Sequence, residues 1–398
     1  MGQWQCIYFQ RNHRDHLPPT TGIKYQLNMT NQSATTPHKI VDKNTIREKR
    51  GLHTLVARNM DPNEFLGIII GEKFKKYRER WDLAGKSKNN TPYPLHVNFE
   101  VSYGCNYKCK MCMCSLPYNK WGHNVEPKKN ITFDKYKEVV DEGVPLGLGA
   151  VSLNGYNEPL LQKDIVRYVQ YAKYKGVPDI FFVTNASLLT KEISHELLES
   201  ELTRIMFSLD AATSETYALL RNDQGFENVI SQIRYFLKLK EEKGLSLPLT
   251  RVSFVQNRQN IHEQKQFEEY WKDKVDYVFI QRFHNSFLGN RDIEGSDKIK
   301  NVQLDYRMTS EQMSKYGVKQ SPQFFDCYQP FQRLYISNNG DVHPCCASYG
   351  MRLVLGNIYK NSLLEIWNNK ETQSFRKIIN DEDKQPEICR LCRKAQND

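Results

Sequence analysis

A repeated strand-then-helix pattern between residues 96 and 280 constrains the fold of this chain more than any other feature. Short apolar runs rich in β-branched and aromatic residues begin about 36 residues apart on average, and amphipathic stretches lie between most of them. Parallel strands need such crossover helices, so the pattern predicts an α/β protein whose parallel sheet curves into a partial (β/α)6 TIM-like barrel. The expected strands are His96–Val101, Ala150–Leu153, Ile180–Val183, Arg204–Leu209, Arg251–Val255 and Tyr277–Ile280. The expected helices include Gln162–Lys175, Lys191–Glu201, Phe226–Lys243 and Gln264–Lys274.

Three cysteines directly follow the first expected strand. Cys105, Cys109 and Cys112 have the spacing C-x3-C-x2-C, so one short loop offers three thiolates. Structural zinc takes four protein ligands, and cubane iron–sulfur clusters normally take four cysteines. A loop that supplies three leaves one coordination position for a non-protein ligand, at the strand end where barrels place their active sites. The alternative is a zinc loop that takes its fourth ligand from Cys114 or His123.

The cysteine loop and the later strand ends together resemble the radical S-adenosylmethionine (SAM) superfamily. Residues 154–161 resemble its Gly-Gly-Glu-Pro motif, residues 184–186 its Thr-Asn-Gly segment with Ala186 in the glycine place, and residues 208–210 its Ser-x-Asp segment. The resemblance implies a catalytic [4Fe-4S] cluster on the three cysteines, with SAM on the open iron. It also implies a set of SAM-binding side chains: Glu158, Asn185, Ser208, Asp210, Arg221 and, near the adenine by position only, Met111.

A second group of cysteines lies in the C-terminal quarter. Asn339-Gly340 is a hairpin turn signal, and such a hairpin would bring Cys327 near Cys345. The terminal C-x2-C pair, Cys389 and Cys392, would then complete a four-thiolate site. From about residue 320 to 394 the pattern resembles the SPASM extension of radical SAM enzymes. The resemblance implies one auxiliary [4Fe-4S] cluster on these four cysteines, and a four-cysteine zinc ribbon is the alternative.

Cys346 directly follows Cys345, and adjacent side chains in an extended segment point in different directions. We therefore expect only Cys345 to be a cluster ligand. Cys346 would then be a thiol close to the cluster that could return a hydrogen atom to a substrate radical, as is thought for some related epimerases. The alternative is a buried, inert cysteine.

The positive charge of the chain is concentrated at its N-terminal end. Residues 1–90 carry 16 Lys and Arg against 8 Asp and Glu, which is +8 of the total +10. Only Asn63–Asp82 of this segment has a helical pattern. We interpret it as a polar, basic arm that recognises an acidic partner, or else as a solvated tail. The expected domains are thus residues 1–90, the barrel at 91–300 and the SPASM-type domain at 301–398.

Composition also restricts the compartment and the partners. The mean hydropathy is -0.67 and no 18-residue apolar run is present, so no membrane span is expected. Ten cysteines without a recognisable signal peptide indicate a reducing cytoplasm, where clustered cysteines usually bind metal. The basic arm lacks the regular aromatic residues that stack on bases, so a nucleic-acid substrate is not expected.

Three functions are compatible with these features. In two of them, a 5′-deoxyadenosyl radical made by reductive cleavage of SAM abstracts a hydrogen atom from a peptide or carbohydrate, with flavodoxin or ferredoxin as electron donor. The substrate radical is then either reduced by Cys346, which gives an epimer, or oxidised through the auxiliary cluster. The third is a non-catalytic iron–sulfur or zinc protein that acts in interaction or electron transfer.

Overall fold

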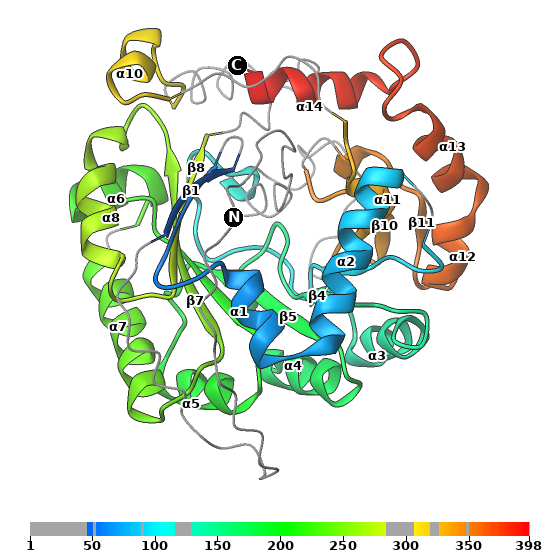
Figure 1. Ribbon diagram of the computed structural model, residues 1–398, viewed down its shortest axis with the longest axis horizontal. Helices are drawn as coiled ribbons and strands as arrows, with labels where there is room; N and C mark the ends of the chain where they lie inside the picture. Colours follow the sequence, from blue (N-terminus) through cyan, green and yellow to red (C-terminus); the bar gives the residue numbers. More distant parts are fainter. Residues whose placement is uncertain are drawn as a thin grey trace, which may run out of the picture.

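Six parallel strands form the centre of the structure, a computed structural model that describes residues 46–50, 53–88, 91–115, 129–223, 225–283, 306–318, 326–347 and 350–397. They are β3 (His96–Phe99), β4 (Ala150–Ser152), β5 (Asp179–Thr184), β6 (Arg204–Ser208), β7 (Leu249–Gln256) and β8 (Tyr277–Arg282). Within the described residues the whole sheet has the order β1-β2-β8-β7-β6-β5-β4-β3-β9-β10-β11. Each central strand coincides with one of the six expected runs, which confirms the predicted partial barrel (Figure 1).

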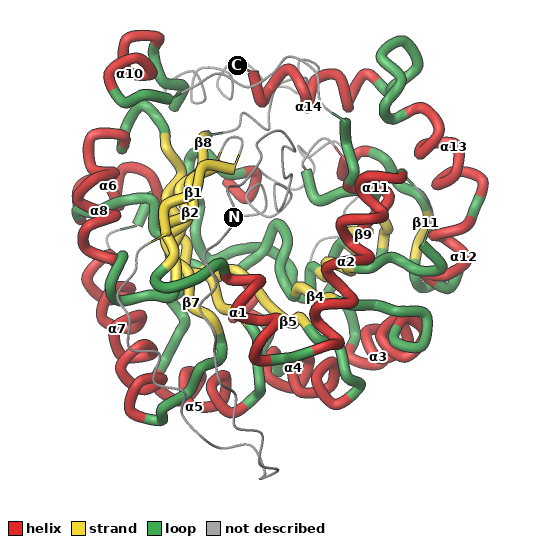
Figure 2. The backbone as a smooth tube through the Cα atoms, viewed as in Figure 1, coloured by secondary structure: helices red, strands yellow, loops and turns green. Residues whose placement is uncertain are grey.

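Helices surround the strands on their outer side, as Figure 2 shows. They are α3 (Phe133–Gly143), α4 (Ile165–Tyr174), α5 (Lys191–Glu199), α6 (Ser214–Arg221), α7 (Phe226–Glu242) and α8 (Gln264–Trp271). Alternate strand residues pack against them: Phe207 on β6 meets Phe236 on α7 at a ring-centroid distance of 5.9 Å, and Phe254 on β7 meets Phe267 on α8 at 4.9 Å. Because side chains alternate along a strand, the intervening residues face the inside of the barrel.

The described part of the expected N-terminal arm or accessory segment, residues 46–88, belongs to the sheet and its core. β1 (Ile46–Arg50) and β2 (His53–Ala57) form a hairpin, and β2 pairs antiparallel with the edge strand β8. Pairing satisfies the backbone groups of that edge and buries Leu55 and Val56. Residues 1–45 lie outside the described residues.

Two helices then cross the amino ends of the central strands. They are α1 (Pro62–Ile69) and α2 (Glu72–Ser87), which confirms the predicted helical stretch. The ring of Trp81 on α2 lies 6.1 Å from that of His96 on β3, and Tyr77 packs directly against Gly149, just before β4. These contacts place α2 at the end of the barrel opposite the cysteine loop. Asn63 on α1 accepts from Arg204 at the start of β6 at 3.1 Å, which places α1 at the same end.

The C-terminal segment continues the same sheet. β9 (Arg333–Ile336) pairs parallel with β3, and β10 (Asp341–His343) and β11 (Gly356–Asn357) follow antiparallel. The turn between β9 and β10 contains Gly340 at φ 89°, which confirms the predicted hairpin. The helices of this region are α10 (Ser310–Lys315), α11 (Gln329–Gln332), α12 (Leu363–Asn368), α13 (Lys370–Ile378) and α14 (Glu387–Asn397).

Short 3-10 turns occupy several loops: Met113–Ser115, Pro159–Leu161, Ile261–Glu263 and Gly350–Arg352. The expected domain boundary near residue 300 lies outside the described residues. Every helix in the described part of the chain is too short or too polar to cross a lipid bilayer.

Candidate active site and auxiliary thiol site

The loop after β3 presents its three cysteines at the carboxyl end of the barrel. Cys109 and Cys112 are buried and Cys105 is partly exposed. The amide of Cys112 donates to the carbonyl of Cys109 at 2.9 Å, which closes a tight turn between the last two thiols. Gly104, at φ 75°, takes the left-handed conformation that lets the chain leave the strand.

Polar side chains from the end of β5 and from the last residue of α6 reach this loop. The Nδ2 of Asn185 lies 3.9 Å from the sulfur of Cys105, and an Nη1 of Arg221 lies 3.9 Å from the sulfur of Cys109. Burial is the main cause that raises the pKa of Cys105 to about 12. Three thiols with a guanidinium beside them fit an anionic metal–thiolate group, because the cation offsets part of the ligands' charge.

Glu158 is fully buried beside the cysteine loop. Its amide donates to the carbonyl of Gly104 at 2.9 Å, and its carboxylate accepts from the hydroxyl of Thr184 at 2.5 Å and the amide of Asn185 at 2.8 Å. Burial raises its pKa to about 7, although these donors oppose the shift. Glu158 therefore joins the ends of β4 and β5 to the loop.

Asp210 and Arg221 form a buried ion pair, with 2.6 Å between Oδ2 and Nη2. The other carboxylate oxygen of Asp210 accepts the amide of Val255 at 2.9 Å. Burial raises the pKa of Asp210, and the nearby Arg221 opposes this. Two of the expected SAM contacts are therefore bonded to each other.

The remaining expected SAM contacts lie on the walls near this pair. Met111 is buried in an apolar cluster with Leu220, Val255 and Tyr306. Ser208 is buried on β6, opposite Ser253 on β7. In the described structure the Oγ of Ser253 and both amide atoms of Gln281 on β8 are buried without a hydrogen-bond partner. Since Phe254 faces α8, the side chain of Ser253 faces the inside of the barrel.

The four cysteines expected to bind the auxiliary cluster come together. Burial is the larger cause and the nearby Cys327 thiol the second cause that raise the pKa of Cys345 to about 12. Burial also raises the pKa of Cys389, and the thiols of Cys327, Cys345 and Cys392 add to that shift. Asn380 fixes the backbone at Cys327, because its side-chain oxygen accepts from the amide of Cys327 at 2.7 Å.

Cys346 differs from the expectation of a free thiol. Its sulfur is disulfide-bonded. The residue is fully buried, with an Nη1 of Arg333 3.8 Å from its sulfur. A bonded sulfur has no hydrogen atom to give, so the donor role would require prior reduction.

The zinc alternatives gain no support from the geometry. No three His, Cys, Asp or Glu side chains among the described residues converge as the ligands of a single metal ion would. His123, the other proposed zinc ligand, lies outside the described residues.

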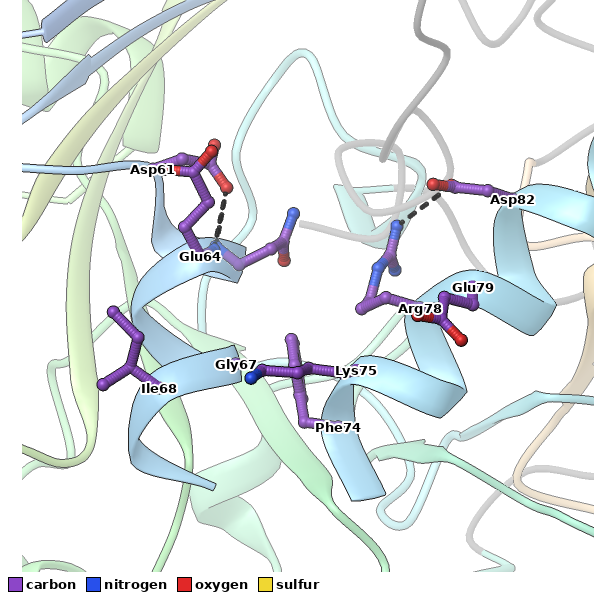
Figure 3. Close-up of a pocket in the computed structure, with 10 residues that line it drawn as sticks. Asp61, Glu64, Gly67, Ile68, Phe74, Lys75, Arg78, Glu79 and Asp82 are labelled. Carbon is purple, nitrogen blue, oxygen red and sulfur yellow. Dashed lines mark hydrogen bonds and ion pairs between the residues drawn. The ribbon is translucent and has the colours of Figure 1, made fainter. Parts of the chain in front are cut away.

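A pocket of about 530 Å³ lies elsewhere, between α1 and α2 (Figure 3). Four carboxylates and two basic side chains line it, and Arg78 forms an ion pair with Asp82 across 3.7 Å. Asn63, one of its lining residues, contacts Arg204 at the start of β6, so the pocket faces the amino ends of the strands. It contains none of the expected site residues.

Sequence reasoning missed the residues that connect the two thiol sites. Tyr156 contacts both sites, and the hydroxyl of Tyr335 donates to Glu100 at 2.9 Å. The available signal was Glu100 itself, a charged residue inside an apolar strand run, at an inward-facing position. Tyr156 lies within residues 154–161, but nothing in the sequence distinguishes it as a link between the two sites.

The barrel, the three-cysteine loop at its carboxyl end and the four-thiol site beside it define a radical SAM fold with an added cluster domain. Sequence-family comparison agrees, since the Radical SAM superfamily matches residues 99–251 and the SPASM iron–sulfur cluster-binding domain matches residues 327–393. The chain belongs to the radical SAM enzymes that carry a C-terminal SPASM domain. Its cofactors are SAM and two iron–sulfur clusters, and the non-catalytic alternative is not favoured.

Individual relatives are distant. An AdoMet-dependent heme synthase of Methanosarcina barkeri is 25% identical over 336 residues, which cover 76% of this chain and 89% of the relative. The subtilosin biosynthesis protein AlbA of Bacillus subtilis is 24% identical over 304 residues, but the match spans only 63% of its length. The solved structure of Streptococcus suis SuiB bound to its precursor peptide SuiA has a TM-score of 0.53 and 15% identity, and covers 88% of this chain and 94% of that one. At this identity the structural likeness shows the fold alone.

Proposed function

We propose that this enzyme removes a hydrogen atom from a peptide substrate and that the resulting radical is oxidised through the auxiliary site. The observation that carries the proposal is the state of the SPASM cysteines. Cys327, Cys345, Cys389 and Cys392 gather as a ligand set, whereas the sulfur of Cys346 is already bonded. The substrate loses one hydrogen atom to the deoxyadenosyl radical and then one electron and one proton, so the product is lighter by two hydrogen masses.

The residues at the carboxyl end of the barrel have complementary roles in this proposal. Cys105, Cys109 and Cys112 would hold the catalytic cluster, which when bound supplies the electron that cleaves SAM. The buried carboxylate of Glu158 would accept from the SAM amino group, and Arg221 would bind its carboxylate. Ser208 and Asp210 would orient the ribose, Asn185 would fix the loop beside Cys105, and Met111 would pack on the adenine through its polarisable thioether.

The inner wall of the barrel supports a neutral, polar substrate group. The unpartnered groups of Ser253 and Gln281 can both donate and accept, and burial without a partner costs about 1–3 kcal/mol for such a group. A peptide amide would satisfy both. The relative AlbA is named for the biosynthesis of a bacteriocin, subtilosin, which favours a peptide over a carbohydrate.

Epimerisation is the second candidate, because Cys346 directly follows the expected ligand Cys345. It requires that the disulfide of Cys346 be reduced, as the reducing cytoplasm proposed for this enzyme would favour. Flavodoxin or ferredoxin would deliver the electron in either case. The excess of Lys and Arg over Asp and Glu in residues 1–90 supports recognition of an acidic partner.

Cleavage of SAM without substrate tests the first half of the proposal. Anaerobically reconstituted enzyme treated with dithionite should convert SAM to 5′-deoxyadenosine, and Cys109→Ser should lose this activity because one ligand of the catalytic cluster is removed. Cys114→Ser is the matched control: it removes a buried thiol of the same loop that is not an expected ligand, and should retain cleavage. Equal activity in the wild type and Cys109→Ser would refute the assignment.

A reaction in deuterium oxide tests the second half. The enzyme would be incubated with a peptide library and, separately, with a panel of sugars, and products would be analysed by mass spectrometry. Oxidation predicts a peptide product lighter by two hydrogen masses, without solvent deuterium. An unchanged formula plus one deuterium that disappears in Cys346→Ala would support epimerisation, and turnover of sugars alone would refute the peptide assignment.

A further inference from the structure

Tyr156 lies between the two thiol sites and is hydrogen-bonded to a cysteine that flanks each of them. Its backbone carbonyl accepts from the thiol of Cys114 at 3.1 Å, two residues beyond Cys112. Its phenol hydroxyl donates to the backbone carbonyl of Cys346 at 3.3 Å, next to Cys345. The side chain is 1% exposed, so neither bond competes with bulk water.

The backbone around Tyr156 is fixed from its other side. Its amide donates to the hydroxyl of Tyr335 at 3.2 Å, and that hydroxyl donates to Glu100 at 2.9 Å. A Cβ on the preceding Gly155 would lie 1.9 Å from the Tyr335 hydroxyl, so β9 packs directly on this backbone. A displacement of the segment would therefore be transmitted to the loop of Cys346, because close-packed interiors do not absorb such shifts.

The same short segment reaches the SAM side through Glu158, two residues later. The amide of Glu158 donates to Gly104, and the hydroxyl of Ser102 donates to the Glu158 carbonyl at 3.0 Å. Asn157 closes the segment internally, since its Oδ1 accepts the amide of Gly155 at 2.6 Å. Residues 155–158 thus form one hydrogen-bonded unit with Glu158 at one site and Tyr156 at the other.

We infer that Tyr156 is a positioning residue that couples SAM binding to the auxiliary cluster, so that an occupied SAM site changes the reduction potential of that cluster. The inference rests on the proposed function, which places SAM against Glu158 and a cluster on Cys345. Hydrogen bonding and solvent exposure around cluster sulfurs set reduction potentials, so a small movement of the 345–346 backbone is sufficient. By reciprocity of linked binding equilibria, reduction of the auxiliary cluster changes the affinity for SAM by the same factor.

A redox titration of the reconstituted enzyme, monitored by electron paramagnetic resonance, tests the coupling. The probe is S-adenosylhomocysteine, which keeps the amino, carboxylate, ribose and adenine groups of SAM but has no sulfonium to cleave. We expect the probe to shift the midpoint potential of the auxiliary cluster in the wild type, and the shift to disappear in Tyr156→Phe. A shift that persists in Tyr156→Phe, or a wild type that shows none, overturns the inference.

Tyr168→Phe is a matched control. Tyr168 is also buried in the core, and its hydroxyl also donates to a backbone carbonyl, that of Ile131, at 2.9 Å. The two variants lose the same atom and the same kind of bond, but Tyr168 contacts neither cysteine loop in the bonds described. Tyr168→Phe should keep the probe-induced shift; its loss there as well would show a general effect of core destabilisation and overturn the assignment to Tyr156.

Amide hydrogen exchange of the wild type gives a second readout that needs no variant. Binding of the probe should slow exchange in the peptide that contains residues 342–347, and unchanged exchange there would contradict the coupling. A wild type with fewer than two clusters, or with no 5′-deoxyadenosine formation, would refute the proposed function and the coupling with it. Two clusters and normal SAM cleavage without a Tyr156-dependent shift would refute the coupling alone.

Discussion

Asp210 and Arg221 form a buried ion pair whose two members serve both the fold and the expected SAM site. Both side chains are 1% exposed, so removing one partner leaves the other charge buried without compensation. We predict that Asp210→Ala lowers the free energy of unfolding by about 3–5 kcal/mol and that the double variant Asp210→Ala/Arg221→Met recovers most of it. Urea unfolding of the two variants measures this difference.

Calorimetric titration with SAM distinguishes the two roles of the pair. Binding should be weaker than wild type in both variants, because the expected contacts to ribose and carboxylate are missing in each. If the double variant regained both stability and SAM affinity, the pair would be purely structural.

His96 gives the protein a predictable acid sensitivity. Burial, together with Arg333, Arg78 and Arg204, holds its pKa well below the usual value near 6.5. Below about pH 6.5 the unfolded chain therefore binds a proton that the folded state does not, and stability falls by about 1.4 kcal/mol per pH unit. Above that pH the contribution of His96 is fully present.

His96→Gln should remove that part of the pH dependence. Urea unfolding between about pH 5 and 7 is the measurement, and the exposed His262→Gln is the control. Equal slopes for the wild type and His96→Gln would contradict the prediction.

Among the elements, α2 depends on one glycine for its docking onto the barrel. A Cβ at Gly149 would lie 2.1 Å from the Cδ2 of Tyr77 and 2.8 Å from its Cβ, so the ring cannot rotate away. We predict that Gly149→Ala destabilises the protein by about 1–3 kcal/mol and increases amide exchange in α2. Gly67→Ala on α1 is the control: its new Cβ would meet Lys75 at an ordinary 3.5 Å, and helix propensity favours alanine by up to about 1 kcal/mol.

The elements also show where sequence patterns stop being informative. The six central strands were predictable because each is an apolar run bounded by a helix of period 3.6. β2 was missed because His53–Ala57 is short and lies in a basic, polar region, and because the partner that makes it a strand, β8, is more than 200 residues away. Edge pairing of this kind is decided by the assembled sheet and not by local propensity.

For the whole molecule, the chemistry-bearing residues were easier to predict than their connections. The seven expected cluster ligands lie in patterns that predict their role, and their thiols lie in two groups in the structure. The bond between Tyr156 and Cys346 spans 190 residues and joins two segments that carry no shared pattern. The disulfide of Cys346 was likewise invisible, because thiol spacing does not determine pairing.

The separation of the cysteines into two sets predicts that each cluster can be removed alone. Wild-type enzyme, reconstituted anaerobically, should contain about eight irons with matching sulfide, and Cys389→Ser should contain about four. Since the barrel loop is unchanged in Cys389→Ser, SAM cleavage to 5′-deoxyadenosine should persist while oxidised peptide is no longer formed. Cys109→Ser should retain about four irons as well but lose cleavage. Metal, sulfide and product analysis of the three proteins measures these outcomes. A wild type that contained about four irons and one zinc would instead have a structural zinc at the SPASM site. Oxidation through that site would then be impossible, because zinc has no accessible redox chemistry.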